Sequence, residues 1–105
     1  MPQEKNDIKP ERYVLGQNYP NPLNPKTTIS FQVKELSRVT VIVYNILGEK
    51  IEELTDLPYN HGRYQVTFDA SDLSSGIYFY EMRADAIKSA SSFRQVKKKT
   101  RQNDK

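Results

Sequence analysis

The stretch RVTVIVYNILGEKIEEL, from Arg38 to Leu54, decides the fold that we expect for this chain. Its first part, Val39 to Tyr44, is rich in β-branched and aromatic residues, which favour a packed strand. Apolar side chains occur on both faces of this strand, so it is predicted to lie in the centre of a sheet. Asn45 and Gly48 supply the residue types of a hairpin turn. The more polar segment Glu49 to Leu54 is then predicted to return as an outer strand.

Further strands are predicted on both sides of this hairpin. Thr27 to Val33 and Gly62 to Asp69 alternate apolar and polar residues, and Ile77 to Ala84 is apolar on both faces. Tyr13 to Gln17 and Phe93 to Lys97 are shorter candidates for edge strands. About seven antiparallel strands at spacings near ten residues, without helical periodicity, predict an all-β sandwich.

Three connections have distinctive sequences. Asn18 to Pro25, NYPNPLNP, contains three prolines. Each lacks a backbone donor and restricts the residue before it, so a stiff extended crossing is predicted, with Tyr19 and Leu23 available to pack beneath it. Thr55 to Asn60 contains Pro58 and is predicted to be a loop. Asp69 to Gly76, DASDLSSG, is predicted to form one short helical turn that Gly76 closes in a left-handed conformation.

The composition divides the chain into three parts. Residues 1–12 are polar and charged, which is typical of a linker or leader. Residues 13–98 are predicted to form the sandwich, and residues 99–105 a basic, flexible tail. No apolar run is long enough for a membrane span, so no membrane insertion is predicted. Met1 to Lys9 has no apolar core of the kind found in signal peptides.

Charge is distributed unevenly along the chain. The sequence has 16 basic and 13 acidic residues, for a net charge of +3. Up to Ile87, 12 acidic residues outnumber 9 basic ones, whereas 7 basic residues and 1 acidic residue follow from Lys88 onward. The basic end could attract phosphate-rich partners. However, no aromatic residue follows Phe93 to stack on bases, so no nucleic-acid partner is predicted.

The residue types that usually carry catalysis or bind metals are sparse. The chain has no cysteine and one histidine, His61, at a loop-to-strand junction. A metal site or a catalytic triad would lack its other members there. Asp69 and Asp72 could share a cation such as calcium, but capping of the local turn explains them more simply. The nearby serines read as turn residues, namely Ser71, Ser74 and Ser75. We therefore predict no enzyme, no metal and no cofactor.

The seven tyrosines allow a carbohydrate-binding alternative, because aromatic faces stack on sugars. Four of them alternate on predicted strands and are expected to pack in the core or on the sheet surface: Tyr44, Tyr64, Tyr78 and Tyr80. Tyr13, Tyr19 and Tyr59 lie in less regular segments and are the candidates for an exposed platform.

Four segments together resemble a known family: NYPNPLNPKTTISF, VTVIVYNILGEKI, GRYQVTFDASDLSSGIYFYEMRA and FRQVKK. In this order they are similar to the type A C-terminal sorting domain of the type IX (Por) secretion system of Bacteroidota. The similarity runs from about Tyr13 to Lys98. It implies an immunoglobulin-like β-sandwich at the end of a larger precursor. This domain would act as a recognition tag for the type IX secretion machinery.

The resemblance also implies a route for the precursor. A signal peptide elsewhere in the precursor would take it to the periplasm, and the N-terminal cargo would then reach the cell surface or the medium. A sortase-like peptidase removes the domain in many members. The expected recognition surfaces are the C-terminal region from Phe93 to Lys99 and the turn from Asp69 to Gly76. The candidate residues are Phe93, Val96, Lys97, Lys98, Lys99, Asp69, Asp72 and Gly76.

The chain departs from the family pattern at its end. Members continue the last strand with three or four apolar residues after the paired lysines, whereas Lys99 to Gln102 occupies that place here. Asp85 to Ser92 is also expected to be a longer loop. The polar replacement predicts a frayed last strand. An open edge there could accept a strand from a neighbour, so the main alternative function is a structural or adhesive module.

Overall fold

The structure, a computed structural model, describes residues 10–16 and 25–102. These residues form seven strands: β1 (Val14–Leu15), β2 (Lys26–Val33), β3 (Ser37–Tyr44), β4 (Lys50–Tyr59), β5 (Gly62–Asp69), β6 (Gly76–Ala86) and β7 (Ser92–Arg101). The ranges 1–9, 17–24 and 103–105 lie outside the described residues, and with them most of the proline crossing, including Tyr19 and Leu23. The linker assigned to residues 1–12 therefore stays a prediction.

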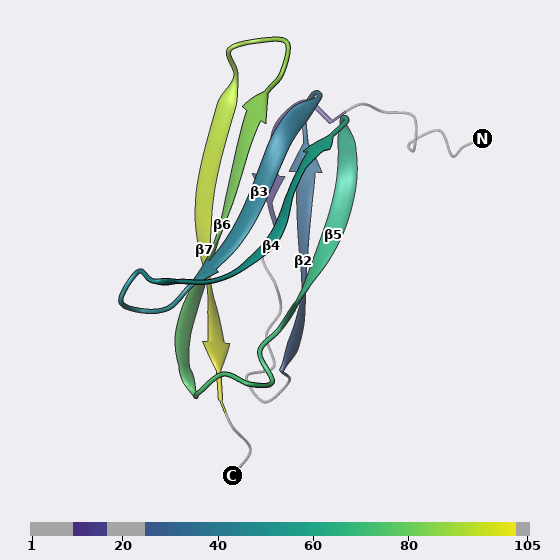
Figure 1. Ribbon diagram of the computed structural model, residues 1–105. Helices are drawn as coiled ribbons and strands as arrows, with labels where there is room; N and C mark the ends of the chain where they lie inside the picture. Colours follow the sequence, from purple (N-terminus) through teal and green to yellow (C-terminus); the bar gives the residue numbers. More distant parts are fainter. Residues whose placement is uncertain (1–9, 17–24, 103–105) are drawn as a thin grey trace, which may run out of the picture.

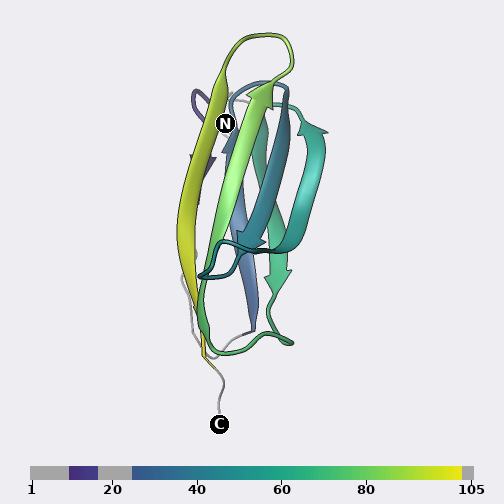
Figure 2. The ribbon, with the colours of Figure 1, turned by 60° about the vertical axis from the view of Figure 1, so that its left-hand side comes forward.

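The strands form two sheets that pack face to face (Figure 1, Figure 2). The smaller sheet has the order β1–β2–β5, and the larger has the order β4–β3–β6–β7. Every pairing between neighbouring strands is antiparallel. The predicted all-β sandwich of about seven antiparallel strands is therefore confirmed.

The central position predicted for the valine-rich strand is also confirmed. β3 lies between β4 and β6. Val39, Val41 and Val43 point into the sandwich and are at most 1% exposed. The turn that follows uses Asn45 as predicted, because its side-chain Oδ1 accepts the backbone N–H groups of Leu47 and Glu49 at 2.9 Å. Gly48 has a φ of 83°, which favours glycine.

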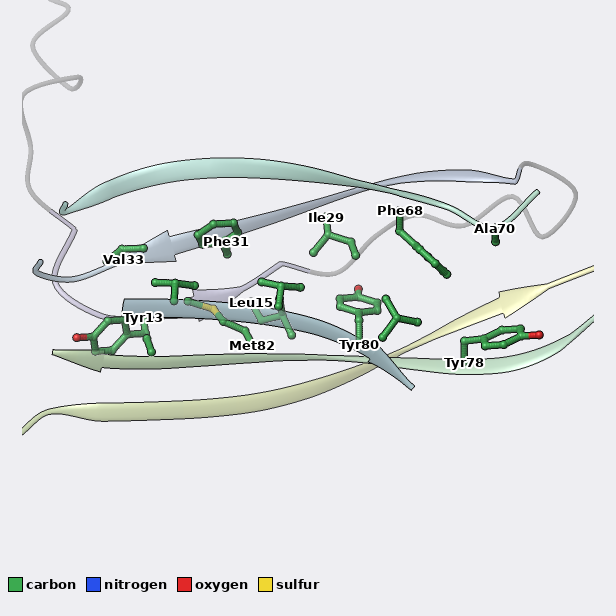
Figure 3. Close-up of a cluster of buried hydrophobic side chains, with 14 residues drawn as sticks. Tyr13, Leu15, Ile29, Phe31, Val33, Phe68, Ala70, Tyr78, Tyr80 and Met82 are labelled. Carbon is green, nitrogen blue, oxygen red and sulfur yellow. The ribbon is translucent and has the colours of Figure 1, made fainter. Parts of the chain in front are cut away.

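The core lies between the two sheets (Figure 3). Leu15, Ile29, Phe31, Val33 and Phe68 contribute from the smaller sheet, and the larger sheet supplies Tyr78, Tyr80, Met82 and Ala84 beside the three valines. Burying one large apolar side chain contributes about 1.5–3 kcal/mol. The alternation seen in the sequence is therefore what joins the two sheets.

The predicted loop from Thr55 to Asn60 is wrong, because β4 continues to Tyr59 through Pro58. β3 is paired with β4 along its length, and Pro58 is the partner of Arg38 in that register. β4 has no second neighbour among the described strands. An edge strand tolerates proline because one side of its backbone needs no ladder partner.

The helical turn predicted between Asp69 and Gly76 is also wrong. No helix occurs in residues 10–16 and 25–102. Instead the Leu73 N–H donates to the Ala70 carbonyl at 3.0 Å in a single turn. The Asp69 carboxylate accepts the Ser71 backbone N–H at 2.9 Å and also the Ser71 hydroxyl. Such local side-chain bonds compete with helix formation. Gly76, with a φ of 155°, begins β6.

The last strand is longer and more regular than expected. β7 pairs with β6 continuously, from Ser92 opposite Asp85 to Arg101 opposite Gly76. Residues 99–101, expected in a frayed and flexible tail, are its last three residues. The ladder depends on backbone groups, and β6 offers a partner over its whole length.

The part of the chain that the structure describes also has no helix long and apolar enough to cross a membrane.

Candidate recognition surface

β7 forms one edge of the larger sheet, and its side chains alternate between two faces. One row is paired with the inward-facing residues of β6 and consists of Phe93, Gln95, Lys97, Lys99 and Arg101. The other row is exposed on the outer face and consists of Arg94, Val96, Lys98 and Thr100. The inward row thus changes from an aromatic residue to cations along the strand. The outward row combines two cations with an apolar residue, Val96, that is 45% exposed.

The final residues of β7 are attached to the turn between β5 and β6. Arg101 is 8% exposed, and its Nε donates to the Ala70 carbonyl at 3.1 Å. Its Nη1 also donates to the Gln102 carbonyl at 2.6 Å. Arg101 therefore fixes the end of the chain against the turn.

Lys99 lies next to Arg101 on the same face and is 1% exposed. It is opposite Tyr78 in the ladder. Burial lowers the pKa of the Lys99 amine, and the charge of Arg101 lowers it further. None of the ion pairs among the described residues involves Lys99. The long aliphatic stem of lysine packs on apolar surface as a hydrophobic residue would.

The turn contributes negative charge to the same end of the molecule. Asp69 and Asp72 are exposed, as is Gly76. Hydrogen bonds from the side chain and backbone of Ser71 hold the pKa of Asp69 below its usual value, and the charges of Lys26 and Arg101 contribute in the same direction. The carboxylate of Asp69 is therefore ionised at neutral pH beside the cationic end of β7.

The predicted site residues fall into two groups. Lys97, Lys98 and Lys99 lie in the half of β7 that ends beside Asp69, Asp72 and Gly76. Val96 lies on the outer face near the middle of the strand. Phe93 lies at the other end of β7, where its ring stacks on Tyr13 with the centroids 5.5 Å apart. Because Phe93 is partly buried there, its position supports a packing role.

Glu81 is not among the predicted site residues, and it is 2% exposed on the outer face of β6. The Tyr44 hydroxyl donates to it at 3.1 Å, Arg83 Nε lies 3.3 Å away, and Arg94 Nε donates to its second oxygen. Burial alone would raise the pKa of Glu81. The hydrogen bonds from Arg94 and Tyr44, with the charges of the two arginines, outweigh burial and lower that pKa. A lone carboxylate in the apolar stretch IYFYEMRA is the signal that marks such a cluster.

Two of the three tyrosines considered for an exposed platform are packed, and the third, Tyr19, lies outside the described residues. Tyr13 is 8% exposed, and its hydroxyl shares a 2.8 Å hydrogen bond with Ser37 Oγ, so its ring is not available as a binding platform. Tyr59 is partly buried in a cluster with Phe31 and Tyr64. His61 is an exposed loop residue, and the described residues contain no cluster of potential metal ligands. These observations do not favour a carbohydrate platform.

A β-sandwich with a charged edge strand, tied to one of its turns, has the features of a domain that acts through protein recognition. The chain matches the family model of the secretion system C-terminal sorting domain over residues 17–98, and it belongs to that family. Searches of curated proteins and of solved structures found no match.

Membership confirms the resemblance and gives the domain its function. It is a C-terminal sorting signal for a cargo protein of type IX secretion. The domain therefore interacts with the type IX machinery and is joined to a cargo part that precedes it. That cargo is secreted or displayed at the cell surface. A family of sorting signals is not a family of catalysts.

Proposed function

We propose that the type IX machinery recognises this domain at the end where β7 finishes beside the turn between β5 and β6. We call this end the recognition end and define it by Lys97 to Arg101 together with Asp69 to Gly76. The observation that supports it is the regular pairing of β7 through Arg101, with Arg101 bonded to Ala70. A fixed strand presents its side chains with less conformational entropy to lose on binding than a frayed tail.

The recognition end displays charges of both signs in a defined arrangement. Lys98 projects outward from β7, and Asp69 and Asp72 are exposed on the turn. Electrostatic complementarity of this kind sets orientation and association rate more than affinity. The receptor surface that fits it would carry an acidic group for Lys98 and a basic group for the turn.

The cargo would be attached at the opposite end of the sandwich. Tyr13 packs beside Phe93 and Ser37, far along the core from Ala70 and Tyr78 (Figure 3). A cargo that precedes Tyr13 would therefore leave the recognition end open. This separation favours reading the domain as a folded unit while its cargo remains attached.

The remaining steps of the route belong to the same proposal. The precursor would reach the periplasm through a signal peptide elsewhere in its chain. A sortase-like peptidase would then cut ahead of Tyr13, within the linker predicted for residues 1–12. The contacts at the start of the sandwich support this position. Gln32 Nε2 donates to the Arg12 carbonyl at 2.8 Å, and β1 begins at Val14. A cut ahead of Tyr13 would therefore leave the strands intact. Sequencing the new terminus of the released domain would test it.

The recognition end is tested by charge reversal in an export assay. A signal peptide and a fluorescent reporter would precede the domain, in cells with a working type IX system. Lys98→Glu and Asp72→Lys are expected to reduce the exported reporter at least tenfold. Lys88→Glu, an exposed change in the loop at the opposite end, is the matched control and should export normally. Normal export of both recognition-end variants, with thermal melts unchanged, would refute the proposed surface.

A further inference from the structure

Both edges of the larger sheet lack a second neighbour among the described strands. β7 pairs only with β6, and β4 pairs only with β3. Each of these edge strands is 10 residues long. An edge strand presents unpaired N–H and C=O groups that can pair with another chain. Among the described strands, the larger sheet therefore has two edge strands of equal length whose outer backbone groups can pair with another chain.

The two edges carry opposite charge. β7 contains only basic charged residues, namely Arg94, Lys97, Lys98, Lys99 and Arg101. β4 contains three acidic residues, Glu52, Glu53 and Asp56, against a single Lys50. Like charges opposite each other destabilise strand pairs, whereas opposite charges stabilise them. Pairing of β7 with β7, or of β4 with β4, is therefore disfavoured, and pairing of β7 with β4 is favoured.

The strand directions allow the favoured pairing without inverting either molecule, so only the ordinary twist between neighbouring strands has to be continued. Neighbouring strands alternate in direction through the order β4–β3–β6–β7 (Figure 1, Figure 2). β4 and β7, at the two edges, therefore run in opposite directions. A second molecule shifted sideways by the width of the sheet would place its β4 antiparallel to β7 of the first.

The charges would also meet on the same face of such a sheet. Glu53 is opposite Ile42 and Asp56 is opposite Thr40, both on the outer side of β3. Arg94 is opposite Arg83 and Lys98 is opposite Phe79, both on the outer side of β6. A direct sideways shift therefore places Arg94 level with Asp56 of the next molecule. A slide of two residues along the strands places Lys98 level with Glu53 rather than with Lys50. Cross-strand partners on one face lie close enough for their side chains to interact.

We propose that this domain associates with a second copy of itself, β7 of one molecule pairing with β4 of the next to continue the larger sheet. The contact is heterologous and repeats without closing, so it generates open chains of molecules. The contact between copies is weakened by two register shifts in β4. One lies between the partners of Val41 and Ile42, and the other lies between the partners of Val43 and Tyr44. Bulges protect an edge from tight pairing. The association is therefore reversible and sensitive to salt.

Sedimentation velocity of the complete chain tests the proposal. The parent is expected to sediment faster as its concentration rises at about 20 mM salt, and as a monomer at about 500 mM salt. Two variants reverse the outer face of one edge each. One carries Glu53→Lys and Asp56→Lys on β4, and the other carries Val96→Glu, Lys98→Glu and Thr100→Glu on β7. Each variant alone should be monomeric at low salt, because the outer faces of its β4 and β7 then carry charge of the same sign.

An equal mixture of the two variants is the decisive sample. The basic β4 of the first variant repels its own basic β7 but attracts the acidic β7 of the second variant. The mixture should therefore recover at least half of the parent's association. A parent that stays monomeric at low salt would overturn the proposal and leave the β7 edge to other proteins. A mixture that stays monomeric, with both variants folded by circular dichroism, would overturn it equally.

Cross-linking provides a second measurement that does not depend on charge reversal. The chain has no cysteine, so single cysteines can be placed freely. Glu53→Cys and Lys98→Cys would be made in separate chains and mixed with a short bifunctional thiol reagent. The heterotypic dimer is expected to exceed either homotypic dimer severalfold. Equal yields of the three dimers would overturn the proposed pairing.

Discussion

Replacing Lys99 by methionine is expected to stabilise the domain. Lys99 is 1% exposed and faces inward from β7. The described residues place no carboxylate in an ion pair with its amine, and Arg101 on the same face adds a like charge. Methionine keeps an unbranched stem of similar length and removes the charge. The substitution thus separates the packing of the stem from the cost of burying the cation.

The size of the effect follows from that cost. Burying an ion costs several kcal/mol after relaxation, and replacing buried ions by apolar groups of similar volume often stabilises by about 1–4 kcal/mol. A lysine amine sits at the end of a flexible stem and recovers part of its hydration. We therefore expect a gain of about 1–2 kcal/mol in the free energy of unfolding. Each kcal/mol raises the melting temperature of a domain of this size by about 4–8 °C.

The gain should depend on pH with a defined sign. The pKa of Lys99 in the folded protein lies below its ordinary value of 10.5. Between these two pKa values the unfolded chain binds more protons, so the stability of the parent rises with pH there. The advantage of Lys99→Met is therefore full below the folded-state pKa and shrinks as the pH approaches 10.5. Urea unfolding of both proteins at pH 7 and pH 10 measures it.

Lys98→Met is the matched control, because Lys98 is the exposed neighbour on the other face of β7. Its effect on the free energy of unfolding should stay within about 0.5 kcal/mol. A loss of stability in Lys99→Met at neutral pH would refute the reasoning. It would mean that the amine has a stabilising partner in the folded protein.

Three further substitutions test other parts of the fold by urea unfolding. Glu81→Gln removes the charge that pairs with two arginines, and we expect a loss of about 1–3 kcal/mol. The pKa of Glu81 is held below 4.5. The loss of stability should therefore be present above pH 4.5 and fade as the pH falls through the folded-state pKa. A loss of stability that does not depend on pH would contradict this account. Gly48→Ala should cost about 1 kcal/mol, since φ is 83° and no atom lies within 4 Å of the added methyl group. Unchanged stability would show that the turn has another conformation. Tyr13→Phe should cost about 1 kcal/mol through the lost bond to Ser37 Oγ. A neutral result there would indicate that water replaces the hydroxyl.

The parts of the fold that the sequence predicted are those with apolar periodicity or turn chemistry. Val39, Val41 and Val43 identify β3 because three buried β-branched residues at a spacing of two can share only one face of a strand. Asn45 and Gly48 identify the hairpin because the side-chain bonds and the positive φ are specific to those residue types.

The prediction failed where backbone pairing outweighed residue type. Pro58 and the polar end of β7 have no strand-like composition, yet both pair with a neighbour that already has a fixed position. Lys99 and Arg101 are buried through their stems and through the bond to Ala70, which an apolar pattern does not reveal. The strand predicted from Ile77 to Ala84 already offers a backbone partner for most of β7, and β6 extends that partner to Gly76 and Ala86.

The candidate site shows the same division. Local sequence suggested the cations of β7 and the turn after Asp69 as separate surfaces. Their meeting depends on the hairpin of β6 and β7 and on Arg101, which was expected to be solvated. On sequence alone Phe93 is grouped with the cations of β7 as a candidate recognition residue, and only the fold places it against Tyr13. Long-range pairing is therefore what a single sequence did not supply.

The most direct test of the sorting function is export of a reporter by this domain. A signal peptide and a fluorescent protein would be fused ahead of Tyr13 to Lys105, in parental bacteria and in a strain without the type IX translocon. We expect the reporter at the surface or in the medium of the parental cells only. A reporter that stays in the periplasm of both strains, with the domain folded, would contradict the function assigned to this chain.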